Sequence, residues 1–213
     1  GGVGPMEFLV PWRLLLPQEV FREVYATDGG DLKHIARVSG ARLDVTQSVP
    51  VAAARGSVLV TLQGTMWQKR TAGRALVDRV FEVHGVDRLN WWKFSAGLST
   101  LLPGAAYETV ASADVGESVR VIGARMRVEP LGGSAEEPPR FAVHFEGNAQ
   151  QVVSAVTRVN TAIQDLADQG RVRASDFVED GGPSMASIAE SVRSARLAPA
   201  AGAATQPPHA WQP

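Results

Sequence analysis

Hydrophobic residues alternate with other residues at the start of the chain, over residues 8–16. The residues that would share one side of an extended chain there are Phe8, Val10, Trp12, Leu14 and Leu16. Because side chains alternate along a strand, this pattern predicts a first strand. Pro17 suits the first position of a helix, where its missing N–H costs no hydrogen bond, so we expect a short helix over 18–25.

A different spacing follows, over residues 31–39. Apolar or small residues recur there at helical intervals, at Leu32, Ile35, Ala36 and Ser39, which predicts a second helix that ends at Gly40. The pattern then returns to alternation over 42–45 and over 58–62, which predicts two strands around a loop at 47–56. A long helix is predicted over 65–83. The order strand, helix, helix, strand, strand, helix indicates one antiparallel sheet with three helices on one face.

The chain also contains an internal repeat. Residues 40–45 (GARLDV) are echoed by 123–128 (GARMRV), and 60–64 (VTLQG) by 143–147 (VHFEG), both at an offset of 83. Upstream, 15–17 (LLP) matches 101–103 at an offset of 86, so the second copy has lost three residues in between. For the second copy we predict strands at 89–94, 125–129 and 141–146, and helices at 103–111, 114–122 and 149–166.

The repeat divides the chain into domains. We predict an α+β protein with two modules of order βααββα, at 7–84 and 87–169, each a three-stranded antiparallel sheet with three helices on one face. Residues 171–213 are rich in Ala, Pro and Gly and are interpreted as a tail. Within the tail, a helix at 184–197 is predicted, and its apolar stripe offers a docking surface through Met185, Ile188 and Val192.

Composition and charge narrow the function. The 213 residues include 21 Lys and Arg and 22 Asp and Glu, a net charge of -1, which argues against a chain-wide electrostatic grip on nucleic acid. Residues 1–88 carry 11 basic and 9 acidic residues, whereas 89–170 carry 6 and 9. Cysteine is absent, which excludes disulfides and thiolate zinc sites. No apolar run has the length of a membrane span, so we expect no membrane partner.

The sequence lacks the patterns of common enzymes. It has no phosphate-binding Gly-x-x-x-x-Gly-Lys loop and no Gly-x-Ser-x-Gly turn. The four histidines, His34, His84, His144 and His209, are spread along the chain without the spacing of metal ligands. We therefore expect no catalytic residues, no metal and no cofactor.

The motifs of the first copy resemble those of the eukaryotic (type I) KH domain. The resemblance rests on residues 15–17 (LLP), 26–30 (ATDGG), 32–35 (LKHI) and 39–45 (SGARLDV), and on the strand that ends in Gly64. The second copy looks like a divergent module of the same kind, so the whole chain resembles a tandem KH protein. The resemblance implies an intracellular protein that binds single-stranded RNA, with a Gly-x-x-Gly loop between the first two helices clamping the backbone of the RNA.

On this resemblance, the RNA-binding residues belong to the first copy. They are the loop residues Ala26, Thr27, Asp28, Gly29 and Gly30, and the basic residues Lys33, His34, Arg37, Arg42 and Arg55. The loop departs from the family's pattern, because one glycine is lost and Asp28 brings a negative charge close to the phosphate, with Asp31 adding a second. The second copy has no such loop, so we expect it to be structural or protein-binding. Arg125 and Arg127 on its predicted strand point away from the core, to RNA or to solvent.

Several apolar residues predict contacts between the modules or with a partner protein. Those on the helix-free faces of the first strands are Leu9, Pro11, Leu15, Trp91 and Trp92. Two functions remain open. In one, the first module binds single-stranded RNA in RNA processing or mRNA regulation. In the other, both modules have lost that ability, and the chain is a protein-interaction scaffold within a ribonucleoprotein complex.

Overall fold

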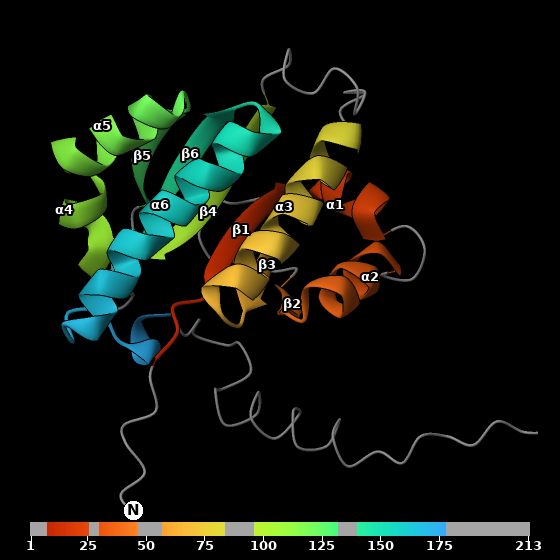
Figure 1. Ribbon diagram of the computed structural model, residues 1–213, viewed down its shortest axis with the longest axis horizontal. Coiled ribbons are helices and arrows are strands. Elements are labelled where there is room, and N and C mark those ends of the chain that lie inside the picture. The colour runs from red at the N-terminus through yellow and green to blue at the C-terminus, as the bar shows by residue number, and fades with distance from the viewer. Residues whose placement is uncertain (1–7, 26–29, 47–56, 84–95, 132–139, 178–213) are drawn as a thin grey trace, which may run out of the picture. The chain divides into compact units, whose positions relative to one another are not determined.

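The computed structural model of this chain describes residues 8–25, 30–46, 57–83, 96–131 and 140–177 (Figure 1). By their contacts, the residues divide into one compact unit, Gly1–Phe177, and a second unit, Val178–Pro213. The second unit lies outside the described residues, and the predicted helix at 184–197, with Met185, Ile188 and Val192, lies outside them too. All the elements named below belong to the first unit.

The first half of this unit has the predicted elements in the predicted order. They are β1 (Trp12–Pro17), α1 (Gln18–Tyr25), α2 (Gly30–Ser39), β2 (Arg42–Thr46), β3 (Ser57–Gln63) and α3 (Met66–Val83). The predicted end of α2 is confirmed, because Gly40 has a φ of 69° and its N–H donates to the carbonyl of Ala36 at 2.9 Å.

The second half repeats this order. Its elements are β4 (Ala96–Pro103), the 3-10 turn η3 (Gly104–Ala106), α4 (Tyr107–Val110), α5 (Ala113–Ile122), β5 (Arg125–Leu131), β6 (Arg140–Gly147) and α6 (Ala149–Asp168), followed by the 3-10 turn η4 (Ala174–Phe177).

The first described strand of the second half is β4, which begins after the predicted segment 89–94. That segment, with Trp91 and Trp92, lies outside the described residues. β4 ends at Pro103 as β1 ends at Pro17, in agreement with the offset of 86. Because Gly97, Ser99 and Thr100 are small or polar, the hydrophobic alternation of β4 is weak. The bulky residues at 89–94 match the pattern of a strand better.

A single antiparallel sheet contains all six described strands, in the order β2-β3-β1-β4-β6-β5. The two separate sheets of the prediction are joined, because β1 pairs with β4, with Leu14 opposite Thr100 and Leu15 opposite Ser99. An edge strand exposes unpaired N–H and C=O groups, so this pairing removes one edge from each half. The α+β class is confirmed, with a continuous sheet in place of two.

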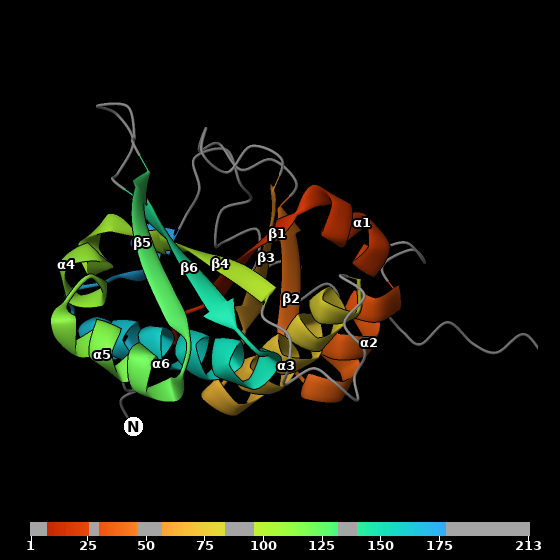
Figure 2. The same ribbon diagram turned by 90° about the horizontal axis from the view of Figure 1, so that it is seen from above.

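The long helices α3 and α6 lie side by side over this sheet, with α2 beside α3 and α5 beside α6 (Figure 1). Viewed from above, these four helices lie on the same side of the strands (Figure 2). The main core fills the space between, with contributions from both halves, such as Trp12 and Leu14 from β1 and Phe141 and Phe145 from β6.

The helix-free face of the sheet has a smaller buried cluster. It consists of Leu15, Leu59, Leu101, Leu131 and Ala142. Leu15, one of the candidate interface residues, is therefore only 7% exposed. Pro11 is also buried, whereas Leu9 is 42% exposed.

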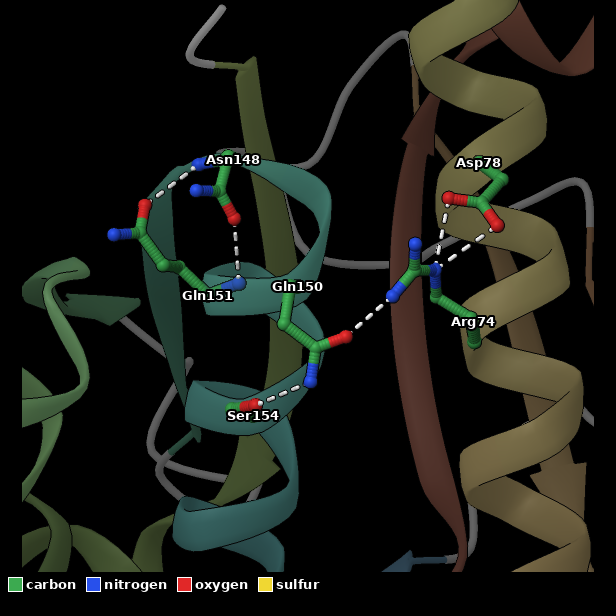
Figure 3. Close-up of polar contacts among 6 residues, drawn as sticks. All are labelled: Arg74, Asp78, Asn148, Gln150, Gln151 and Ser154. Carbon is green, nitrogen blue, oxygen red and sulfur yellow. Dashed lines mark hydrogen bonds and ion pairs between the residues drawn. The ribbon is translucent and has the colours of Figure 1, made fainter. Parts of the chain in front are cut away.

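The internal repeat extends to hydrogen bonds at the start of α6 and α3. Asn148 and Gln151 form a capping box, in which each side chain accepts from the other residue's backbone N–H at 2.9 Å (Figure 3). In the first half, 83 residues earlier, Thr65 and Gln68 make the same pair of bonds at 2.9 and 3.3 Å. The repeat thus preserves how each long helix begins.

Both glutamines of these capping boxes also contact the glycine that ends the preceding helix. The Nε2 atom of Gln68 lies 3.1 Å from the point where a Cβ of Gly40 would stand, and that of Gln151 lies 2.5 Å from the equivalent point on Gly123. Gly40 and Gly123, at φ of 69° and 87°, are both left-handed. In each half, the side chain of one glutamine therefore fills the space in which a Cβ of the helix-ending glycine would stand.

The segment before β1 is held by both long helices. Lys69 of α3 donates from Nζ to the carbonyl of Val10 at 2.6 Å. Gln164 of α6 accepts from the N–H of Val10 and donates to the carbonyl of Phe8, both at 2.8 Å. Residues 171–177, which we assigned to the tail, belong to this folded unit, since Val172 is buried and the ring of Phe177 packs on Phe8.

Candidate nucleic-acid interface

Most of the predicted RNA-binding residues that the structure describes belong to the helix α2. It turns Leu32, Ile35 and Ser39 into the core against α3. The hydroxyl of Ser39 donates to the carbonyl of Ile35 at 2.7 Å and accepts from the N–H of Ala41 at 3.1 Å, which fixes the turn into β2. The rotation of the helix is set by these inward residues, and the rotation in turn determines which side chains reach solvent.

The outward face of α2 brings together three of the predicted RNA-binding residues. Lys33, His34 and Arg37 are all exposed, and Nη2 of Arg37 lies 3.4 Å from Nδ1 of His34. Val38 follows on the same side and is 60% exposed. We call Lys33, His34 and Arg37 the α2 basic face. It combines positive charge with a flat ring and an apolar neighbour, a mixture suited to a phosphodiester with unstacked bases.

The structure does not bring Arg42 to this face. Arg42 lies opposite Gln63 of β3, while its neighbour Leu43 lies opposite the core residue Leu62. Since successive side chains of a strand point to opposite faces, Arg42 is on the helix-free side of the sheet. There it forms an ion pair with Asp44, at 3.0 Å between Nε and Oδ2.

Most of the predicted RNA-binding loop precedes the first described residue of α2. The predicted residues Ala26, Thr27, Asp28 and Gly29 lie outside the described residues, as does Arg55. Gly30 is the first residue of α2.

An arginine that the sequence analysis missed contacts the first turn of α2. Nε of Arg79, on α3, lies 2.8 Å from Oδ2 of Asp31, and its Nη1 lies 3.1 Å from Oε2 of Glu82. The hydrogen bonds to Asp31 and to Glu82 raise the pKa of the Arg79 guanidinium above its ordinary value. Asp31, expected to repel phosphate, is thus engaged by a positive charge. The two residues are 48 positions apart, and no local pattern predicts their contact.

The corresponding face of α5 differs in charge. At the offset of 83, Lys33 and His34 are replaced by Gly116 and Glu117, and Arg37 by Arg120. Arg120 forms an exposed ion pair with Glu117, with Nε and Oε2 2.7 Å apart, and this hydrogen bond lowers the pKa of Glu117. The α5 face is therefore close to neutral where the α2 face is positive.

A row of polar residues crosses the helix-free face of the second half. Oγ of Ser99 lies 2.7 Å from Nδ1 of His144, and Nε2 of His144 lies 2.8 Å from Oε2 of Glu129. Arg127 donates to the same carboxylate at 3.0 Å. The hydrogen bond from His144, with the charge of Arg127, lowers the pKa of Glu129. Nη1 of Arg125 lies 3.8 Å from Oε1 of Glu146. Both arginines point away from the core, as predicted, and both lie beside carboxylates.

Three broader findings bear on function. No helix in the described part of the chain has the length and hydropathy needed to cross a bilayer. Among the same residues, no three histidine or carboxylate side chains gather into a group that could hold a metal ion. Comparison with models of known protein families and with curated proteins gives no match to this chain.

Proposed function

We propose that this chain is an RNA-associated protein whose first half binds single-stranded RNA at the α2 basic face, in RNA processing or mRNA regulation. The observation that carries the proposal is the exposed cluster of Lys33, His34 and Arg37 on one side of a helix whose other side is buried. These side chains supply donors and positive charge for phosphates, and Val38 beside them supplies an apolar surface for a base.

The element order supports the finer fold assignment within this proposal. Each half runs through strand, helix, helix, strand, strand and helix. In each half the last strand, β3 or β6, pairs with both of the other strands. This agrees with what the resemblance to type I KH domains implies. We assign the two halves as KH-like modules on that basis.

The charge difference between the halves supports the choice of the first as the binding module. The α2 face carries Lys33 and Arg37, whereas the α5 face carries one arginine that Glu117 neutralises. Electrostatic attraction to phosphates supplies most of the sequence-independent affinity for nucleic acid. We therefore assign the second half a structural or protein-binding role.

Reversing the charge of the α2 basic face should abolish most RNA binding. We expect the full chain to bind a fluorescein-labelled 12-nucleotide RNA of mixed sequence at 50 mM salt, and the K33E/R37E variant to bind at least about tenfold more weakly. If two phosphate contacts are lost, the slope of log K against log salt should fall by about 1.4. Fluorescence anisotropy at 50 and 150 mM salt measures both quantities.

The matched control changes the same charge elsewhere. Arg70 on α3 and Arg171 beyond α6 are exposed, so R70E/R171E alters the net charge equally. We expect this variant to lose much less affinity than K33E/R37E. Equal losses would assign the binding to net charge alone. If the wild-type chain does not bind even at low salt, direct RNA binding is wrong, and the protein-interaction scaffold becomes the better hypothesis.

A further inference from the structure

The first turn of α2 contains a negative charge, Asp31, close to the α2 basic face. Asp31 is the second residue of the helix, two positions before Lys33 and three before His34. A carboxylate so close to these basic side chains repels a phosphodiester that binds to them.

Arg79 determines where this carboxylate is held. Its Nε binds Oδ2 of Asp31 at 2.8 Å from the side of α3, and its Nη1 binds Glu82 at 3.1 Å, which fixes the guanidinium between the two acids. Both Arg79 and Asp31 have side chains 39% exposed, so the pair is at the surface beside the α2 basic face. The carboxylate is thus directed toward α3 and is partly neutralised.

The second half lacks this arrangement. Asp114 occupies the position of Asp31, but the position of Arg79 is taken by Ala162. The first turn of α5 is instead capped, since the side chain of Ser112 accepts from the N–H of Val115. The arginine therefore occurs only in the half that carries the positive helix face.

We infer that Arg79 is a positioning residue for RNA binding, which holds the Asp31 carboxylate against α3 and so away from the α2 basic face. This inference rests on the proposed function. Arg79 acts through Asp31 and not by touching the RNA. Removal of the arginine harms binding only while the carboxylate is present.

A double-mutant cycle in the full chain tests this role, with the labelled 12-nucleotide RNA and fluorescence anisotropy. We expect R79M to weaken binding about fivefold, because the released carboxylate opposes the phosphate. D31N should bind as well as the wild type or better. The R79M/D31N variant should return to within about twofold of D31N, because no carboxylate remains to be positioned.

A second cycle on the same helix controls for lost charge and lost packing. Arg74 and Asp78 form an ion pair of similar geometry, at 2.9 Å, with side chains 33% and 35% exposed, and it faces α6 instead of α2 (Figure 3). R74M should weaken binding less than twofold, and D78N should not alter that effect.

The outcomes separate the inference from the function on which it rests. If the wild type binds but R79M behaves like R74M, the inference is wrong and the proposed function stands. If R79M/D31N stays as weak as R79M, Arg79 has a merely structural role, and the inference is again overturned. If the wild type binds no RNA at all, both are overturned together.

Discussion

Gly123→Ala should lower the free energy of unfolding by about 2–4 kcal/mol, and the equivalent change in the first half, Gly40→Ala, by about 1–2 kcal/mol. Both glycines are left-handed, which disfavours any residue with a Cβ. The difference between the two expected losses arises from the glutamine side chain that lies next to each glycine. An alanine Cβ at 123 would stand 2.5 Å from Nε2 of Gln151, whereas one at 40 would stand 3.1 Å from Gln68. Gln151 must therefore move and loosen its capping box, and Gln68 needs only a small shift.

Urea denaturation followed by circular dichroism measures these changes, with Gly116→Ala as the matched control. Gly116 lies within α5, and its added Cβ would meet nothing within 4 Å, so this variant should gain about 0.5–1 kcal/mol. Q151A should reduce the additional loss at Gly123, because the clash disappears while the backbone strain remains. Equal losses at Gly40 and Gly123 would contradict the role that we give to the two glutamines.

The same glutamines illustrate how far the sequence determines the fold. The offset of 83 is evident from the similarity of residues 40–45 to 123–128. It correctly predicts where the helix before each pair of strands ends and where the strands follow. Gln68 and Gln151 share that offset, and with Thr65 and Asn148 they give a recognisable capping signal at the start of each long helix. Local spacing is sufficient to predict these helix starts, because the two residues of each capping box are three positions apart and the repeat relates one box to the other.

The join between the halves could not be predicted in this way. The pairing of β1 with β4 depends on two strands that are distant in sequence and become edges only when each half has folded. The small residues of β4 suit an interior strand but weaken the alternation that identifies strands. For this reason the bulky segment at 89–94 matched the strand pattern better than β4, which is the strand that pairs with β1.

The candidate site was partly predictable for a similar reason. Helical spacing turns Leu32 and Ile35 inward, so the exposure of Lys33, His34 and Arg37 follows from the sequence. Strand alternation, applied equally strictly, would have removed Arg42 from that group, because Leu43 beside it faces the core. The contact of Arg79 with Asp31 depends on how α3 packs against α2, and it is visible only in the folded chain.

The stability of this protein should rise with pH between about 8 and 10, because of Lys69. Its side chain is only 1% exposed, and burial lowers the pKa of its ammonium group to about 8. In the unfolded chain the same group keeps an ordinary pKa of about 10.4. Between these values the unfolded state binds more protons than the folded state, so raising the pH favours folding. Below pH 8 the group is protonated in both states and contributes no slope.

We expect the free energy of unfolding to gain about 2 kcal/mol from Lys69 between pH 7 and 9.5. Urea denaturation at constant ionic strength measures the gain, and K69M should remove it, whereas the exposed Lys33 should leave it unchanged in K33M. Arg13, whose pKa burial and the nearby Arg140 lower to about 10, adds a rise of the same sign only above this range. The neutral amine of Lys69 still donates to the carbonyl of Val10, so the segment before β1 stays attached as the charge is lost. An equal slope in K69M and wild type would mean that the ammonium group is solvated in the folded protein, and that its contact with Val10 does not hold it in the core.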